Sequence, residues 1–160
     1  PDFHQTTDWI KALSLEQSDQ FNSTGLYGQA AIAAAASFSP NPDHPPFFVD
    51  FPFEVVEGKL KQIESIWQKW LIHDPVAMVT AHQGNLRRLR AIHFDCGTSD
   101  PVIIDSRALA QALAGVDVAF EFEEYDGNHL NNISNRVETR VFPFFSEIFV
   151  FELLPPTSVS

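Results

Sequence analysis

Residues 90–129 of the chain read RAIHFDCGTSDPVIIDSRALAQALAGVDVAFEFEEYDGNH. The mostly apolar run 90–96 predicts a strand, and the turn residues 97–101 end it. Apolar side chains then recur at roughly helical spacing from 102 to 115. From 116 to 123, apolar positions alternate with mainly acidic ones, which is the period of a strand with one wet face. The stretch therefore predicts a strand, a helix and a second strand.

An acid and a histidine stand just beyond the two predicted strands. Asp100 ends the turn GTSD at 97–100, and His129 ends the segment YDGNH at 125–129. Strands joined by a crossover helix run parallel, so their carboxyl ends meet at one edge of the sheet. In open α/β sheets, ligands bind at that edge. We therefore expect the Asp100 carboxylate and the His129 ring to lie on adjacent loops, within or near hydrogen-bonding distance.

Each of these two residues also has a simpler interpretation. Asp100 could cap the helix that follows it, with Pro101 in the first turn of that helix. His129 could be an ordinary solvated loop residue. The acid precedes the histidine by 29 residues, with a helix and a strand between them. That order favours a catalytic pair, because it matches the chain order Ser, Asp, His of α/β-hydrolases.

The sequence offers no good candidate for a nucleophile. No Gly-x-Ser-x-Gly motif occurs in the 160 residues. Ser23 comes nearest to one, but the polar residues 16–22 before it cannot form the buried strand that supports a nucleophile elbow. The single cysteine, Cys96, lies in the apolar strand and is expected to be a buried structural thiol.

Composition argues against several classes of function. The net charge is −11, and the only basic cluster lies at 87–90, so nucleic-acid binding is not expected. No apolar run is long enough to span a bilayer, so no membrane span is expected either. The chain opens with Pro1 and has no recognisable targeting segment, so its compartment cannot be read from the sequence.

No cofactor and no metal site are expected. Glycine-rich phosphate loops are absent, which argues against a nucleotide cofactor. His4 with Asp8, and His93 with Asp95, are pairs that lack a third ligand at a suitable spacing. His93 and Asp95 are instead expected to share one face of their strand.

Caps, periodicity and helix breakers predict the remaining elements. These are a helix from about 23 to 36, a rigid extended proline-rich loop at 39–46, an aromatic segment at 47–53, a helix at 59–73, a helix that starts at Pro75 with Asp74 as its cap, and a final helix at 133–149 that is bent or interrupted at Pro143. Parallel sheets need more than two strands, and residues 1–87 offer no further candidates. We therefore expect the missing strands upstream of Pro1.

Three segments resemble the C-terminal half of a family of α/β-hydrolase-fold esterases that includes esterase D-like enzymes and feruloyl esterases. They are GTSD at 97–100, YDGNH at 125–129 and VFPFF at 141–145. The resemblance implies a serine esterase in which Asp100 orients His129 and His129 activates the serine.

A second resemblance concerns the N-terminal part of the chain. SPNP at 39–42, PPF at 45–47 and VDFP at 49–52 resemble a bacterial branch of that family with a helical insertion between the nucleophile helix and the acid strand. The resemblance covers nearly the whole chain and implies that the serine and the oxyanion-hole amides precede the insertion. Residues 40–53, together with the helix that carries Trp67 and Trp70, would then form part of a cap lining an acyl or aryl pocket, or their rings would be ordinary core.

Together these observations predict an α/β protein, the C-terminal portion of an α/β-hydrolase fold. Residues 1–86 would be a helical insertion or cap, 87–150 the core that carries Asp100 and His129, and 151–160 a tail. The expected function is a serine carboxylic-ester hydrolase. Its partners would be an ester substrate and either a serine-bearing N-terminal segment or a second copy of the chain. The alternative is a non-catalytic α/β binding or interaction module, or an inactive esterase fragment.

Overall fold

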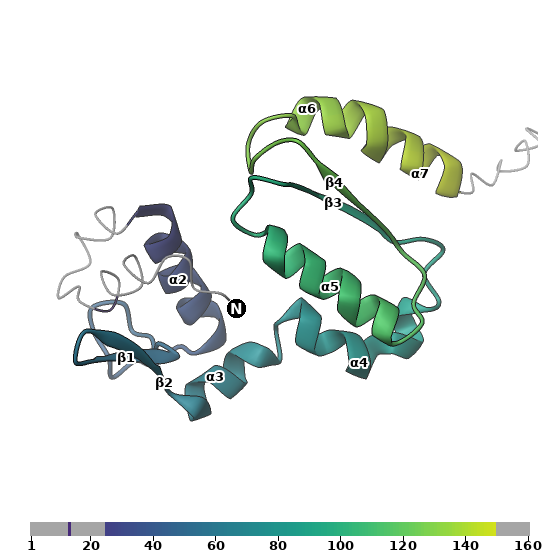
Figure 1. Cartoon of the computed structure of the whole chain (residues 1–160). Helices are drawn as coiled ribbons and strands as arrows, with labels where there is room; N and C mark the ends of the chain where they lie inside the picture. Colours follow the sequence, from purple (N-terminus) through teal and green to yellow (C-terminus); the bar gives the residue numbers. More distant parts are fainter. Residues whose placement is uncertain (1–12, 14–24, 150–160) are drawn as a thin grey trace, which may run out of the picture. The chain divides into compact units, whose positions relative to one another are not determined.

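The computed structural model describes residue 13 and residues 25–149 of the chain. The chain divides into two compact units, Pro1–Gln83 and Gly84–Ser160. Together they give a mixed α/β protein in which the described strands form two small sheets, one antiparallel and one parallel (Figure 1). Each unit is described by itself. The expected tail at 151–160 lies outside the described residues.

The first unit is built around helix α2, Gly25–Phe38, which extends the helix expected at 23–36 by two residues at its end. Ala31, Ile32 and Ala35 of this helix are buried. A second helix, α3, Glu64–Leu71, contacts the end of α2. There the Trp70 indole N–H donates to the Ser39 hydroxyl over 2.9 Å, and its ring meets Phe38 edge-on. This contact joins two segments about thirty residues apart in the sequence.

The proline-rich segment 39–50 is a closed loop, so the expectation of an extended loop is wrong. The loop closes because Asn41 N–H donates to the carbonyl of Phe48 over 2.7 Å and Asp50 N–H donates to that of Ser39 over 2.8 Å. The φ angle that proline fixes is also that of the first central position of common turns, so four prolines are compatible with a chain that folds back. The loop brings Asn41 and Asp50 side by side.

An antiparallel hairpin follows, with β1 at Phe53–Val56 and β2 at Lys59–Gln62. Glu57 and Gly58 between the strands have φ angles of 51° and 74°. A two-residue turn with φ above zero at both positions suits the twist of a hairpin. Two expectations are therefore wrong: the helix does not begin at 59, and residues 1–87 do contain strands. Gly58 is the second residue of a hairpin turn and not the start of a helix.

Helix α4, Pro75–Leu86, begins as the sequence predicts. The Asp74 carboxylate accepts the backbone N–H of Val76 over 2.7 Å. An acidic side chain that accepts an N–H of the first turn satisfies a donor that has no partner within the helix. The expected cap at Asp74 is confirmed.

The second unit contains the expected strand, helix and strand. β3, His93–Gly97, and β4, Glu121–Tyr125, are parallel neighbours in register from one end to the other, and helix α5, Ile103–Gly115, connects them. The pairing predicted from the sequence is therefore confirmed. The described part of the chain supplies this sheet with two strands.

The second strand starts at 121 and not at 116 as expected. The carbonyl of Leu113 accepts the N–H groups of both Val116 and Val118, and Asp117 between them has a φ angle of 54°. A residue in the left-handed region that turns the chain back onto the last helical carbonyls is a common way to end a helix. Residues 116–118 therefore close α5, although their polarity alternates like that of a strand.

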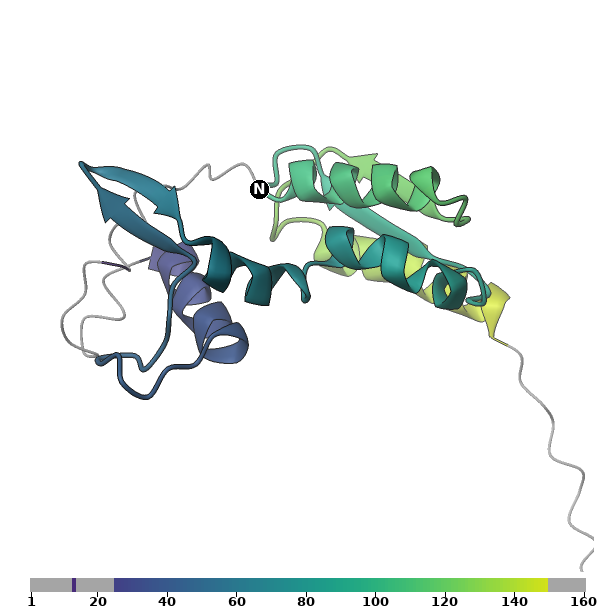
Figure 2. The same cartoon turned by 90° about the horizontal axis from the view of Figure 1, so that it is seen from below.

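Helices cover both faces of the parallel pair (Figures 1 and 2). On one face, Arg107 of α5 donates to Glu124 of β4 over 2.8 Å. On the other face lie α6, Ile133–Arg136, a π-helical segment η2, Val137–Val141, and α7, Phe142–Ile148. His93 contacts the Phe144 ring, and Asp95 bonds to Arg136, so these two strand residues share a face as expected.

The last helix is irregular in the turn before Pro143. Residues 137–141 form the π-helical segment, and Pro143 lies in the first turn of α7. Proline has no N–H and its ring clashes with the carbonyl four residues earlier, so a regular α-helix cannot pass through it unchanged. The expected interruption is present, one turn earlier than Pro143 itself.

Candidate active site

Asp100 is held in a defined position at the carboxyl end of β3. Its N–H donates to the carbonyl of Gly97 over 3.0 Å, and its Oδ1 accepts the N–H of Val102 over 3.0 Å. The side chain is only 7% exposed. A carboxylate so shielded from water must have its oxygens satisfied by protein donors. Val102 satisfies one of them and leaves Oδ2 for another partner.

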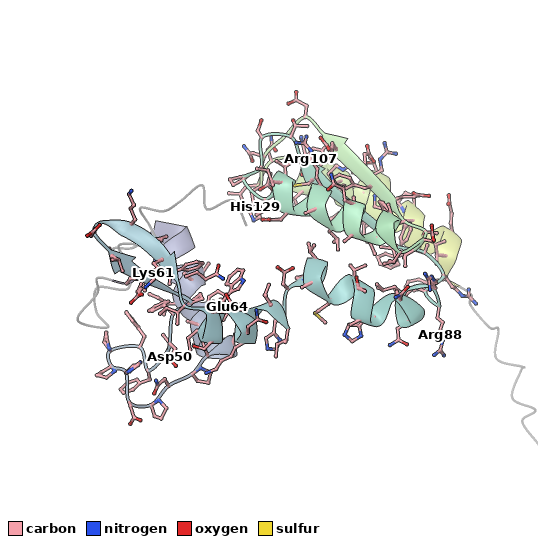
Figure 3. All side chains as sticks on the ribbon, turned by 60° about the horizontal axis from the view of Figure 1, so that its bottom comes forward. Asp50, Lys61, Glu64, Arg88, Arg107 and His129 are labelled. Atoms are coloured by element: carbon pink, nitrogen blue, oxygen red, sulfur yellow. The ribbon has the colours of Figure 1, made fainter. Side chains whose placement is uncertain are left out.

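His129 supplies that partner. Its Nδ1 lies 3.0 Å from Oδ2 of Asp100, and the imidazole is 62% exposed. Asp100 comes from the loop after β3 and His129 from the loop after β4, as the parallel pairing requires. Figure 3 shows His129 in the second unit. The expected proximity of acid and histidine is confirmed. The simpler interpretation, that Asp100 caps the helix with Pro101 in its first turn, is wrong. Helix α5 begins at Ile103, its N-cap is Val102 and no side chain caps it. Oδ1 of Asp100 instead accepts from Val102 within the turn before the helix.

The hydrogen bond fixes which nitrogen of His129 carries the proton in the neutral ring. A carboxylate can only accept, so Nδ1 must be the donor. The Nε2 atom of the neutral ring then carries a lone pair. An exposed ring with this tautomer can take a proton from a neighbouring hydroxyl group at Nε2.

Backbone hydrogen bonds join the two loops that carry the pair. Thr98 N–H donates to the carbonyl of Tyr125 over 2.8 Å, and Ser99 N–H donates to that of Gly127 over 2.9 Å. A Cβ atom on Gly97 would overlap the backbone of Gly127. Glycine at 97 therefore permits the close approach of the loops that places the acid beside the histidine.

Three asparagines hold the loop of His129. The side-chain oxygen of Asn128 accepts the N–H of Asn131 over 3.0 Å, and that of Asn131 accepts the N–H of Asn128 over 2.6 Å. The Asn132 amide donates to the carbonyl of Asp126 over 3.1 Å. These three residues are not predicted from the sequence. Asparagine side chains often bond to nearby backbone groups, and this tendency is a signal for such a turn.

The other acid near the strand end, Asp95, has a different role. Arg136 donates to Asp95 over 2.7 Å and to Glu123 over 2.8 Å, and its guanidinium lies 4.8 Å from the centre of the Tyr125 ring. The hydrogen bond from Arg136 lowers the pKa of Glu123 to about 2, and the bond to Glu123 raises the pKa of Arg136. Asp95 thus pairs with Arg136 beneath the strands, which leaves Asp100 as the acid at the loop.

The remaining candidates in the second unit are structural. Cys96 is a free, buried thiol whose pKa is raised, chiefly by burial, as expected for an inert cysteine. His93 has its Nδ1 3.3 Å from Glu121, and its buried Nε2 has no hydrogen-bond partner among the described residues. In the described ranges no group of three or more His, Cys, Asp or Glu could hold a metal ion. The pair His4 and Asp8 lies outside those ranges.

Residues 25–149 bring no candidate nucleophile into contact with His129. There the hydrogen bond of the imidazole goes to Asp100, and no hydroxyl or thiol bonds to the ring. Ser23, the weak candidate from the sequence, lies outside the described ranges. Within those same ranges, no helix has the length and apolar character that a membrane span needs.

Comparisons with known proteins add no family to this geometry. Neither models of protein families nor curated proteins match the sequence. The site is therefore interpreted from its own residues.

Proposed function

We propose that this chain supplies the acid and the general base of a serine carboxylic-ester hydrolase with an α/β-hydrolase fold. The observation that carries the proposal is the 3.0 Å hydrogen bond between His129 and Asp100 at the carboxyl ends of two parallel strands. The shielded acid and the open imidazole support the two roles. The nucleophile is a serine outside residues 25–149.

Acylation begins when the serine oxygen attacks the carbonyl carbon of the ester. As the new C–O bond forms, the hydroxyl proton passes to Nε2 of His129. Asp100 keeps the ring in its orientation and stabilises the imidazolium without taking its proton. The negative charge of the carboxylate is thus used where positive charge develops on the ring.

The next step breaks the bond to the alcohol. The tetrahedral intermediate collapses, and the leaving oxygen takes the proton from Nε2. A water molecule then attacks the acyl-serine, and His129 again accepts a proton and returns it to the serine oxygen. The free acid is released, and the chain's own groups end in the state in which they began.

The competing function is a non-catalytic binding or interaction module. It is favoured by the bond from Val102 N–H to Asp100, since an aspartate that fixes the turn before a helix needs no catalytic role. In that case the hydrogen bond to His129 would be incidental, and the exposed ring would be a surface residue.

The test uses the protein encoded by the complete reading frame that contains this chain. Hydrolysis of a short-chain aryl ester is measured for the wild type and for His129→Gln. We expect the variant to fold and to lose turnover by orders of magnitude, because glutamine cannot act as a general base. The matched control is His82→Gln, an exposed histidine of α4. Equal turnover in wild type and His129→Gln contradicts the proposal and supports the binding module.

A further inference from the structure

The first unit contains a second pair of aspartate and histidine that the sequence analysis missed. Nδ1 of His44 lies 2.6 Å from Oδ1 of Asp50, and the Asn41 amide donates to the same oxygen over 2.8 Å. The histidine side chain is 63% exposed and the aspartate side chain 18% exposed. Figure 3 shows Asp50 on the proline-rich loop of this unit.

The pair borders a groove of about 630 Å³ within the first unit. Its described lining combines apolar side chains with polar ones on the loop, among them Val49, Phe53, Ile63, Ile66, His44 and Asp50. Val49 and Phe53 are buried in the chain. Grooves of this size, with an apolar wall and a few placed polar groups, are typical of small-molecule sites.

The charges along the groove have one sign. The described lining residues include the carboxylates Asp50 and Glu54 but no lysine or arginine. Glu54 is paired with Lys61 over 3.1 Å, so its charge is largely balanced. Asp50 is the other charged group of the lining. The positive charge of Lys69, which is not among the lining residues, is near enough to lower the pKa of Asp50 but does not pair with it in the way Lys61 pairs with Glu54. An anionic ligand would be repelled here, and a cationic one attracted.

The Asp50 carboxylate also has an acceptor to spare. Both of its side-chain hydrogen bonds to described residues use Oδ1, so Oδ2 has no partner among them. The amide of Asn41 foremost, and then His44, lower the pKa of Asp50 against the effect of burial. The group is therefore a carboxylate at neutral pH, and its second oxygen can accept from a ligand.

We propose that this groove binds a small amphiphilic amine, with the apolar body against Phe53, Ile63 and Ile66 and the protonated amino group on Oδ2 of Asp50. An ammonium group offers three donors and the opposite charge. Hydrogen bonds between charged partners are stronger than neutral ones. The proposal rests on contacts within the first unit and uses neither Asp100 nor His129.

The experiment titrates the protein encoded by the complete reading frame that contains this chain with 2-phenylethylammonium and follows backbone amide shifts by NMR. Two near-isosteric probes, 2-phenylethanol and phenylacetate, are titrated in parallel. We expect the ammonium to shift residues 49–66, the alcohol to bind at least about tenfold more weakly, and phenylacetate not to bind. Equal binding of phenylacetate and the ammonium, or no binding of any probe, would overturn the proposal.

Two variants test whether the Asp50 carboxylate binds the ammonium group. Asp50→Asn should weaken binding of the ammonium by about tenfold or more, because the charge–charge hydrogen bond is lost. Asp43→Asn removes the same charge from an exposed position of the same loop and should leave binding unchanged. Unchanged binding in Asp50→Asn contradicts the proposal. If that variant does not fold, the order of the three probes on the wild type still decides.

Discussion

The two units each contain an aspartate–histidine pair with a shielded carboxylate and an open imidazole, but the pairs are built in different ways. In the first unit, His44 and Asp50 are six residues apart in one loop, and Asn41 from the same loop shares the carboxylate oxygen. In the second unit, Asp100 and His129 are 29 residues apart and meet only because two strands pair. The first pair depends on local turn chemistry, and the second depends on the fold of its whole unit.

This difference in construction carries a difference in expected role. A histidine fixed by long-range pairing keeps one orientation, which general-base catalysis needs. A pair in a single loop beside a groove needs only a placed charge in order to bind a ligand. Substitutions at the long-range pair should therefore change ester turnover, and substitutions at the local pair should change ligand binding and the stability of the first unit.

The largest effect is expected when the two acids are exchanged for amides in the complete protein. Asp100→Asn should lower ester turnover by roughly 10³- to 10⁴-fold, because His129 loses the acceptor that fixes its tautomer and orientation. Asp50→Asn should change turnover of a neutral ester by no more than about threefold, because its carboxylate bonds to Asn41 and His44 and not to the His129 ring. The measurement is kcat for a short-chain aryl ester at saturating substrate.

Asp95→Asn is the control within the same strand. Asp95 pairs with Arg136 and lies away from the loop that holds His129. This variant should therefore retain most of the activity. If Asp95→Asn lost turnover and Asp100→Asn kept it, the assignment of the acid would be wrong.

The second prediction breaks the long-range pair through the backbone. Gly97→Ala should destabilise the second unit by about 3 kcal/mol, because the new methyl group overlaps the backbone of Gly127. Hydrogen exchange should rise in β3 and β4 and stay unchanged in the loop 41–50. Gly115→Ala, whose Cβ would meet no atom within 4 Å, is the matched control. A second unit that kept its protection in Gly97→Ala would show that the loops need not approach so closely.

The parallel pair was predictable because its signals are local and agree with one another. Three signals predict a strand, a helix and a second strand: turn residues at 97–101, helical spacing in α5, and polar residues at the ends of both strands. Asp100 and His129 followed from the rule that parallel strands share an edge. Their catalytic roles remain a prediction, since geometry alone does not test them.

What the sequence did not reveal are contacts between segments and competition between patterns. The alternation of apolar and polar residues at 116–120 predicts a strand. In the structure, the N–H groups of Val116 and Val118 donate to the carbonyl of Leu113 and end the helix there. Gly58 is compatible with a helix start and with a hairpin turn. It lies in a hairpin turn because β1 pairs with β2. The pair His44 and Asp50 was missed because a proline-rich segment was expected to be extended.

The third prediction concerns acid stability. Arg136 lowers the pKa of Glu123 from 4.5 to about 2. A group with a lowered folded-state pKa contributes stability that is present above its unfolded value and is lost as the pH falls towards the folded one. The full shift corresponds to about 3 kcal/mol. The side chain is 34% exposed, so solvent screening reduces the expected loss to about 1–2 kcal/mol between pH 5 and 2.

The two units can be followed separately in this acid titration. All three tryptophans lie in Pro1–Gln83, so their fluorescence reports on the first unit, while the amides of β3 report on the second. Urea titrations at several pH values give the free energy of unfolding from each probe. Glu123→Gln should flatten the dependence seen in β3 and leave the tryptophan signal as it is. An unchanged slope in β3 would assign the acid sensitivity to other carboxylates.

The smallest effect is expected in the local pair. Asn41→Ala removes the hydrogen bond that contributes most to the lowered pKa of Asp50, so that pKa should rise towards 3.8, its ordinary value. The lost bond should cost the first unit about 1 kcal/mol. The titration of the Asp50 carboxyl carbon, followed by NMR, measures the first change, and tryptophan fluorescence in urea measures the second. The hydrogen bonds of Asp100 should be unaffected, because its partners Val102 and His129 come from the other unit. A pKa of Asp50 that did not move would mean that His44 and Lys69 hold the charge without Asn41, and the local pair would then depend on its histidine more than its hydrogen bonds suggest.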